Sequence, residues 1–238
     1  MYKKYEFRFI YQQVHNFCSE TLGAFYLDII KDRQYTTKTD GLPRRSAQTA
    51  LYHISEAFVR WIAPILSFTA EEIWQSLPKV STEQSVFFEQ WYPLPEFSTH
   101  AKVDNETWDL FAQLRFASSK ELEKLRNEKT IGSSLDSEIH LYCDQNLYDA
   151  LQPFADELRF ILICSYVHLH LDDDLPANAI KTDIDGLSLT AKASEHTKCV
   201  RCWHHREDVG SKAEHPELCG RCVENIDESG TGEQRTYA

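Results

Sequence analysis

The sequence predicts a mainly α-helical protein: a helical bundle, then a small α+β segment, then a C-terminal segment built around cysteines. Three observations predict this order. Apolar residues recur at three- and four-residue steps through much of the first part. Short runs that alternate apolar and polar residues follow, and the end of the chain has few aliphatic residues but two Cys-x-x-Cys pairs. We therefore expect three domains, at 1–130, 131–195 and 196–238.

The helices of the first part are predicted from their apolar stripes and their terminal residues. Pro43 suits the first turn of a helix, where its missing N–H is not needed. Thr69 and Glu72 form a capping-box pair, which predicts that a short helix begins there. Prolines interrupt the pattern later on. The sequence thus predicts helices over 5–31, 43–63, 69–77 and 105–129, with an irregular connection between 78 and 104.

The middle of the chain alternates in the manner of strands. Its expected elements are strands at 138–143, 159–164, 166–171 and 187–191, a helix over 146–158, and an acidic loop at Asp172, Asp173 and Asp174. His168 and His170 should face the same side of the sheet, because side chains alternate along a strand. With no acidic or thiol partner expected nearby, both are interpreted as packing or surface residues.

Charge is distributed unevenly along the chain. The formal net charge of −12 argues by itself against a nucleic-acid ligand. Residues 1–60, however, hold nine Lys or Arg and six Asp or Glu, a net of +3, so the rest of the chain carries −15. A locally basic segment is a weak indication of a surface that faces RNA or DNA, and ordinary scatter is the alternative. No apolar run reaches transmembrane length, so a membrane is not an expected partner.

The most specific chemistry lies in four cysteines near the end of the chain: Cys199, Cys202, Cys219 and Cys222. Each Cys-x-x-Cys turn directs two sulfurs at one point, and two such turns can surround one Zn²⁺ ion tetrahedrally. Four sulfur ligands leave no open position for water, so the ion would be structural and not catalytic. Metal binding of this kind contributes on the order of 10 kcal/mol to folding. We expect a zinc ribbon in which all four cysteines bind one ion.

Alternatives to this zinc site remain open. Two disulfides would suit a secreted protein, but the charged start of the chain predicts no signal peptide. A redox Cys-x-x-Cys would be expected once, in a βαβ context. A nearby histidine can replace one cysteine as ligand, the candidates being His196, His204, His205 and His215. The other cysteines lie in apolar runs and are interpreted as buried residues: Cys18, Cys143 and Cys164. This cysteine usage points to a reducing compartment, the cytoplasm.

Three blocks of the sequence resemble the C-terminal part of bacterial isoleucine–tRNA ligases, which are class I aminoacyl-tRNA synthetases. The first block runs from Phe17 to Thr36 and the second from Arg44 to Trp74. Both are shared loosely with the valine and leucine relatives. The third block points to the bacterial isoleucine enzyme; it comprises Lys198–His204, Leu218–Cys222 and the ending Gly232-Glu233-Gln234-Arg235.

This resemblance implies that the helical part is an anticodon-binding domain and that the last segment is a zinc-binding domain that helps to hold the tRNA. The implied partners are a tRNA that accepts isoleucine and the remainder of the synthetase, with the chain monomeric. Basic residues can meet phosphates, and polar or aromatic ones can meet unstacked loop bases. The candidates are Lys31, Arg33, Gln34, Tyr35, Arg44, Arg45, Arg201, Trp203 and Arg221. Structural ion pairs between helices are the alternative for some of the charged residues: Asp28, Asp32, Arg33 and Arg44.

Catalytic signatures are missing from the chain. It has no glycine-rich phosphate loop, no Gly-x-Ser-x-Gly elbow and no His-Glu-x-x-His. The family's ATP-dependent core carries a His-Ile-Gly-His element and a Lys-Met-Ser-Lys-Ser loop; here Met1 is the sole methionine, and no two histidines are three apart. We therefore expect a fragment or split gene product that is inactive alone. Its full-length form would attach isoleucine to tRNA, with ATP bound only in the missing catalytic part.

Two other functions compete with this interpretation. A DNA-repair glycosylase of the formamidopyrimidine type has a C-terminal zinc finger with nearly the same cysteine spacing. Such an enzyme needs a proline directly after the initiator methionine, and Tyr2 stands there instead. A free-standing zinc-ribbon module that binds protein rather than RNA is the second alternative. The length of the resemblance disfavours both.

Overall fold

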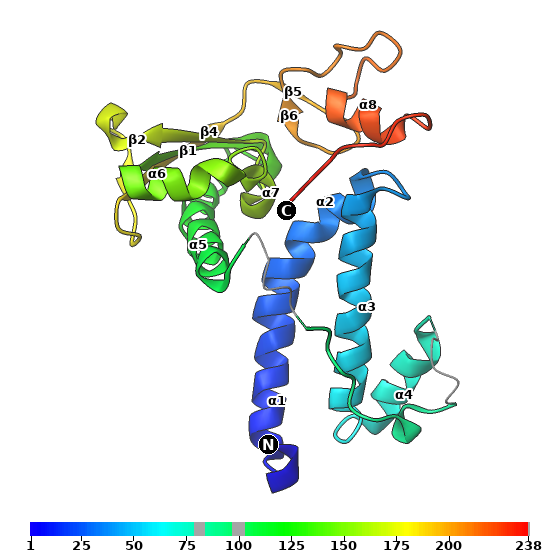
Figure 1. The fold of residues 1–238 in the computed structure, drawn as a ribbon. Helices are drawn as coiled ribbons and strands as arrows, with labels where there is room; N and C mark the ends of the chain where they lie inside the picture. The colour runs from blue at the N-terminus through cyan, green and yellow to red at the C-terminus, as the bar shows by residue number, and fades with distance from the viewer. Residues whose placement is uncertain (79–83, 97–102, 238) are drawn as a thin grey trace.

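The computed structural model describes residues 1–78, 84–96 and 103–237. Two long antiparallel helices form one arm of the molecule, and a small sheet with its own helices lies beside the end of that arm (Figure 1). The cysteine-containing segment lies next to the same end, and the last residues return toward α2. Among the described residues, no helix is both long enough and apolar enough to cross a membrane.

The first long helix runs through three segments without a break. It consists of α1 (Phe7–Asn16), a π-helical segment (Phe17–Leu27) and α2 (Asp28–Thr36), so it continues five residues beyond the expected end at residue 31. In the π-helical segment, a Cβ at Gly23 would lie 2.8 Å from the carbonyl oxygen of Cys18. Glycine at this position therefore permits the wide turn.

The second long helix, α3 (Leu42–Ile62), begins with Pro43 in its first turn, as predicted. The next helix, α4 (Ser67–Ser76), is present, but the predicted capping box is wrong: Leu66 is its N-cap, and Thr69 lies inside the helix. Parts of the expected connection over 78–104 fall outside the described residues, at 79–83 and 97–102. In its described part the chain makes one short 3₁₀ turn, Val86–Phe88, and is otherwise irregular.

Helix α5 (Asn105–Asn127) forms close to the predicted bounds. Asp104 caps it by accepting a hydrogen bond from the Thr107 N–H at 2.8 Å. Although it was expected in the helical bundle, α5 packs on the sheet, where Phe111, Leu114 and Leu122 belong to the same buried cluster as the strands.

A four-stranded sheet has the order β2-β1-β4-β3. Its strands β1 and β2 pair in parallel, whereas β4 is antiparallel to both β1 and β3. The strands are β1 (Ser137–Cys143), β2 (Tyr166–Leu171), β3 (Ile180–Lys181) and β4 (Leu187–Ala193). The predictions of strands at 138–143, 166–171 and 187–191 are confirmed, while β3 was not predicted.

One predicted strand and one predicted helix differ from the structure. Residues 158–162 form a helical turn, α7 (Leu158–Leu162), and not a strand, because a short apolar run buried on all sides has no period that separates the two. Ile163, in the left-handed region with φ 53°, ends α7. The helix expected over 146–158 is shorter: α6 (Gln145–Leu151) is followed by a 3₁₀ turn.

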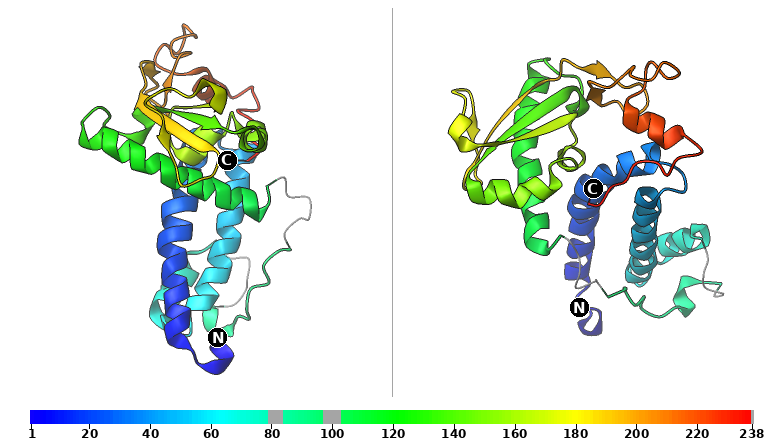
Figure 2. Two further views of the ribbon diagram at one scale, coloured as in Figure 1. Left: turned by 90° about the vertical axis from the view of Figure 1, so that its left-hand side faces the viewer. Right: turned by 45° about the horizontal axis from the view of Figure 1, so that its top comes forward.

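The main core lies on one face of the sheet. Most side chains from β1 and β4 that point to this face are buried beneath α5, α6 and α7, while Ala191 and Ala193 at the end of β4 are half-buried. Cys143 and Cys164 are buried in this core, as predicted, and Cys18 is half-buried. In the right-hand view of Figure 2, α5 passes behind the strands, and the opposite face of the sheet is turned to the viewer without a helix over it.

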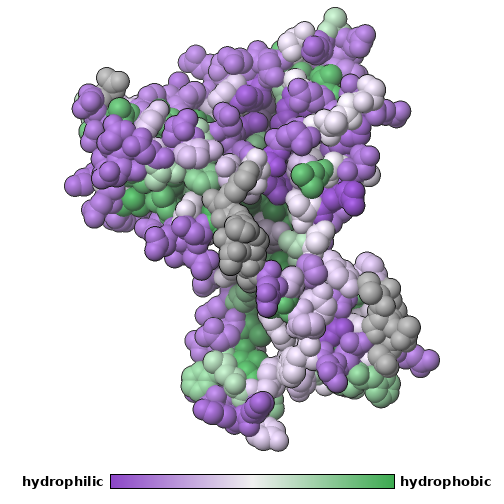
Figure 3. All heavy atoms as spheres, in the orientation of Figure 1, coloured by the Kyte–Doolittle hydropathy of each residue, from purple (hydrophilic) through white to green (hydrophobic). Residues whose placement is uncertain are grey.

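A space-filling view shows apolar side chains gathered over the lower part of α1, near the N-terminus (Figure 3). Phe7 and Phe9, both on α1, are 42% and 55% exposed.

Candidate metal centre and nucleic-acid interface

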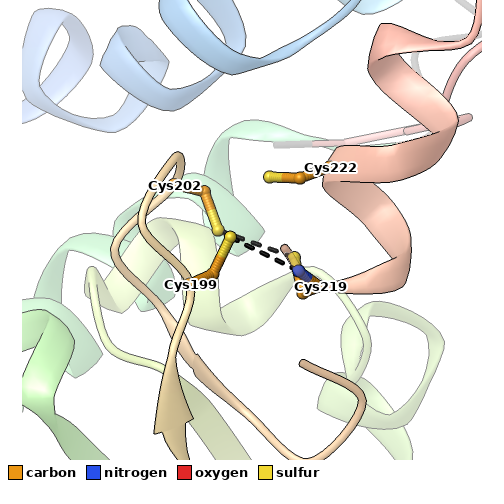
Figure 4. A group of neighbouring side chains, drawn as sticks. All are labelled: Cys199, Cys202, Cys219 and Cys222. Carbon is orange, nitrogen blue, oxygen red and sulfur yellow. Dashed lines mark hydrogen bonds between the residues drawn. The ribbon is translucent and has the colours of Figure 1, made fainter. Parts of the chain in front are cut away.

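Two short elements bring the four cysteines together (Figure 4). Cys199 and Cys202 lie on the turn between β5 (Thr197–Lys198) and β6 (His205–Arg206), which pair antiparallel. Cys219 is the N-cap of α8 (Gly220–Ile226), and Cys222 lies in its first turn. Each Cys-x-x-Cys pair is thus held by a tight local structure, and the two pairs face each other.

The geometry of the cluster fits a tetrahedral metal site. One sulfur from each of the four cysteines lies within 4.8 Å of all the others, and the four residues are 0–6% exposed. The Cys202 Sγ and Cys219 Sγ atoms are 3.7 Å apart. Zn–S bonds of about 2.3 Å in a tetrahedron place sulfurs about 3.8 Å apart. The residues present therefore fit a single ion with four sulfur ligands and no open position.

Two hydrogen-bond donors other than the thiols themselves reach sulfur atoms of the cluster. The Cys219 N–H donates to the Cys199 Sγ at 3.4 Å, and the Arg201 Nη1 donates to the Cys222 Sγ at 3.7 Å. Hydrogen bonds among the four thiols lower the pKa of Cys202 and raise those of Cys219 and Cys222, so the thiols share protons when no cation is bound. A metal ion binds the thiolate form of cysteine, so these contacts prepare the cluster for a cation.

The first turn depends on one residue with unusual backbone geometry. Trp203 adopts the left-handed conformation, with φ 65°. Its N–H donates to the Cys199 carbonyl, and the Cys199 N–H donates to the His204 carbonyl, both at 2.9 Å. These bonds close the turn and leave the Trp203 side chain 62% exposed.

The histidines near the cluster are not part of its ligand set among the described residues. His204 is buried, and its Nδ1 lies 3.3 Å from the Cys202 carbonyl oxygen. His205 contacts the His196 carbonyl oxygen and Asp136. The structure thus groups the four cysteines that the spacing predicted.

The cysteine segment is anchored to α2 through Asp32. The Arg221 Nη1 lies 2.8 Å from both carboxylate oxygens of Asp32, and the Arg235 Nη2 lies 3.1 Å from one of them. Glu233 contacts both guanidinium groups, and Arg235 lies 3.5 Å over the Phe160 ring. Burial alone would raise the pKa of Asp32, but Arg221 and Arg235 hold it well below its usual range.

Two further contacts reinforce this anchor. The Lys38 ammonium donates to the Asp227, Glu228 and Gly230 carbonyl oxygens. The Arg201 Nη1 donates to the Thr36 carbonyl oxygen at the end of α2. Because the terminal carbonyls of a helix lack partners within it, Arg201 satisfies one of them.

Four of the predicted RNA-contacting residues line one cavity of about 420 Å³ between α2 and the first cysteine turn. These are Lys31, Tyr35, Arg201 and Trp203. Tyr35 is 77% exposed and Trp203 is 62% exposed. Lys31 makes an exposed ion pair with Asp28 at 2.9 Å, a contact that contributes little to stability. Two exposed aromatic rings and one lysine therefore line this cavity.

The other candidates lie in different surroundings. Arg45 is exposed, and Arg44 is half-buried beside Thr39, both in the first turns of α3. Arg33 and Gln34 are half-buried, and burial lowers the pKa of Arg33. Arg221 is committed to Asp32 and Glu233, with its side chain 11% exposed.

The structural ion pairs considered for Asp28 and Asp32 are confirmed, but with arginines other than Arg33 and Arg44. Asp28 pairs with Arg115 of α5, and Asp32 pairs with Arg221 and Arg235. Arg235 and Lys38 were not recognised as anchors. A signal for Arg235 existed, since it ends the third block of the resemblance, but spacing alone does not reveal a partner so distant in sequence.

Comparison with known families gives two matches that together cover much of the chain. Residues 1–141 match the family described as anticodon-binding domain of tRNA ligase. Residues 198–225 match the family described as zinc finger found in FPG and IleRS. The second description also names the glycosylase group, whereas the first, longer match is to tRNA ligases alone.

Individual relatives agree with these matches. Isoleucine–tRNA ligases of Methylococcus capsulatus and Thioalkalivibrio sulfidiphilus are each 54% identical to this chain, over 99% and 100% of its length. That of Stutzerimonas stutzeri is 54% identical over the whole chain. The chain spans about a quarter of the length of these relatives, for which the matched share is 25%.

Proposed function

We propose that this chain binds the anticodon stem-loop of the tRNA that accepts isoleucine. The chain belongs to the isoleucine–tRNA ligase family, of which it carries the anticodon-binding and zinc-finger region. The amino-acid ligation named for its relatives would take place in polypeptide outside this chain, with ATP bound there. In this proposal the chain supplies affinity and selection of the tRNA, and no catalytic residue.

The observation that carries the proposal is the cavity between α2 and the first cysteine turn. Tyr35 and Trp203 come from segments far apart in sequence, yet both line it with exposed rings. An unstacked loop base can stack on such rings, which contributes about 1–3 kcal/mol per base. Lys31 lies at the same cavity and can meet a phosphate. Arg45, exposed on α3, extends the basic surface.

We assign other predicted residues to a structural role within this surface. Arg201 and Arg221 hold the cysteine segment on α2, so they would position Trp203 without contacting RNA themselves. Arg33, Gln34 and Arg44 are half-buried and would contribute at most at the edge of the contact.

The metal in this proposal is one structural Zn²⁺, held by Cys199, Cys202, Cys219 and Cys222. Sulfur ligands and tetrahedral spacing favour zinc over metals that prefer oxygen. The ion would fix the turn that presents Trp203. A reduced, cytoplasmic setting follows from a thiolate site.

We keep a boundary near residue 195 for the metal segment, and we assign α5 to the sheet body because it packs there.

Binding of tRNA to single-residue variants tests the proposal. Tyr35→Ala and Trp203→Ala should each weaken binding of isoleucine tRNA about tenfold or more, because each removes one stacking surface. Phe68→Ala is the matched control: Phe68 is 92% exposed, on α4 at the other end of the arm. It should leave the dissociation constant unchanged. Fluorescence anisotropy at fixed salt measures all three.

Two further measurements decide whether the contact is specific. Lys31→Ala should lower the slope of log K against log salt concentration by about one, since one phosphate contact is lost. A tRNA with an exchanged anticodon should bind more weakly than isoleucine tRNA. Equal affinity for both tRNAs, or a loss with Phe68→Ala equal to that with Trp203→Ala, would contradict the proposal.

A further inference from the structure

The open face of the sheet carries a row of imidazole and phenol rings. Side chains on this face alternate with those in the main core, so β1 presents Glu138, His140 and Tyr142, and β2 presents Tyr166, His168 and His170. In the parallel register, His140 is the partner of His168. The rings of His140 and His168 stack with centroids 4.5 Å apart and planes at 19°. Stacked rings turn their edges, and hence their nitrogens, away from the stack.

A carboxylate lies among these nitrogens. The Glu138 Oε2 is 3.6 Å from the His168 Nε2, and the Glu138 Oε1 is 3.7 Å from the His196 Nε2. One ligand atom each from Glu138, His140 and His168 lies within 4.8 Å of the other two. With metal bonds of about 2.0–2.2 Å, ligand atoms in a tetrahedral site lie about 3.4 Å apart. The atoms are near that spacing, and the two stacked imidazole rings would rotate to direct their nitrogens at one ion.

This arrangement corrects the interpretation of His168 as a residue without an acidic partner, while His170 contacts His140. Glu138 comes from β1, 30 residues before His168, and the parallel pairing of β1 with β2 brings it near. The order of the strands was not readable from the sequence.

The surroundings suit a metal ligand set. The His140 Nδ1 lies 2.9 Å from the His170 Nε2, a contact of the kind that orients a ligand histidine through its other ring nitrogen. The Ser194 Oγ donates to the Glu138 Oε1 at 2.7 Å and fixes the carboxylate.

One group opposes a cation at this place. The Lys192 Nζ lies 3.5 Å from the Glu138 Oε2. Its side chain is 57% exposed, and its flexible stem can move the ammonium into solvent. Lys192 thus competes with a metal ion for Glu138 without blocking access to it.

We propose that Glu138, His140 and His168, with His196 as the fourth ligand, form a second metal site on the open face of the sheet, for a divalent transition metal of the zinc class. Imidazole and carboxylate ligands favour such ions over Mg²⁺ or Ca²⁺. His196 precedes β5, so the bound ion joins the sheet to the segment that leads into the cysteine cluster. The site is distinct from the cysteine cluster and does not depend on tRNA binding.

Titration with Co²⁺ tests this site in protein whose cysteine cluster is already filled with zinc. Calorimetry should detect a second ion per chain, and metal analysis after removal of free ion should give one zinc and one cobalt. The spectrum of the bound cobalt should lack the charge-transfer band of thiolate ligands. His140→Ala and His168→Ala should each weaken cobalt binding at least tenfold. His15→Ala, which removes an exposed histidine of α1, should leave it unchanged.

Lys192→Ala provides a test in the opposite direction, because an exposed side chain can be removed without disturbing the fold. Cobalt should then bind several-fold more tightly, since its competitor for Glu138 is gone. In the unaltered protein, bound Co²⁺ should shift the imidazole NMR signals of His140, His168 and His196. One ion per chain at saturation, a cobalt affinity unchanged in both His140→Ala and His168→Ala, or shifts confined to other histidines would each overturn the site.

Discussion

The sheet body and the cysteine segment exclude water from their interiors in different ways. In the sheet body, Ile139, Leu141 and Leu189 are 0–1% exposed beneath a layer of helices. In the cysteine segment, the buried cluster consists of the four cysteines themselves, with Val209 and Leu218 packed partly against it. The interior of the sheet body is an ordinary hydrophobic core. The interior of the cysteine segment consists mainly of the four side chains that would bind the metal ion.

This difference shows what each region depends on. Burial of apolar surface contributes about 25 cal/mol per Å² and needs no partner outside the chain. Four thiols supply little such surface, so the second region depends on a metal ion and on the ion pairs that fasten it to α2. The two regions should therefore unfold under different conditions. The following changes test whether they unfold separately.

Removal of the metal should have the largest effect. Loss of an ion worth on the order of 10 kcal/mol should unfold residues 197–227 and release Arg221 from Asp32. The sheet should keep its protection, because its core contains none of the four cysteines. Hydrogen exchange with and without a chelator, under reducing conditions, measures both regions at once.

A pair of cysteine variants controls for the chelator. Cys202→Ser should reproduce the loss of protection, whereas Cys18→Ser, which alters a cysteine outside the cluster, should not. If the amides of β1 and β4 lose protection together with those of α8, the two regions form one cooperative unit and the comparison fails.

Asp32→Asn should have the next largest effect. The change preserves shape but removes one of the two carboxylates that Arg221 and Arg235 share, leaving Glu233, and breaking a buried ion pair costs up to about 3–5 kcal/mol. The loss should appear as faster exchange in the cysteine segment. Asp40→Asn, at an exposed position in the following loop, should change stability by less than about 0.5 kcal/mol.

The same carboxylate predicts a pH dependence. The pKa of Asp32 is lowered in the folded protein, so its contribution is complete above its ordinary pKa of 3.8 and is lost as the pH falls below that value. Protection in the cysteine segment of the wild type should decline below about pH 4 more steeply than in Asp32→Asn. Parallel declines would show that another group controls the acid transition.

Leu141→Ala tests the sheet body alone. A fully buried leucine replaced by alanine costs about 2–5 kcal/mol, from lost burial and the cavity that remains. Denaturant unfolding followed by far-UV circular dichroism should show this loss, while the protein keeps its full metal content. Thr190→Ala, on the open face of the same sheet, should cost less than about 1 kcal/mol. Loss of metal in Leu141→Ala would mean that the sheet supports the cysteine cluster.

The sequence predicted best the features that depend on local pattern. Pro43 marked the start of α3, alternating residues marked β1 and β4, and the spacing of Cys199 and Cys202 marked one half of the metal cluster. In each case the evidence lies within a few residues of the feature it predicts.

Features that depend on distant partners were missed. A strand was predicted over 159–164, where the structure has the helical turn α7, because only the burial of this segment among helices and strands makes it helical. The anchor between Asp32 and Arg235 joins residues 203 positions apart, and the neighbours of Glu138 depend on the order of the strands. Spacing contains no information on such pairings.

Lys120→Met should have the smallest effect on stability. It tests whether burial decides how much an ion pair contributes. The Lys120 Nζ lies 3.3 Å from the Asp183 Oδ2, a distance close to that of Arg235 from Asp32, and it joins α5 to the loop before β4. The side chains of Lys120 and Asp183 are 51% and 94% exposed, so water and salt screen the pair. A double-mutant cycle with Asp183→Asn should give a coupling below about 1 kcal/mol. A coupling as large as that between Arg235 and Asp32 would mean that exposure does not decide which ion pairs hold this molecule together.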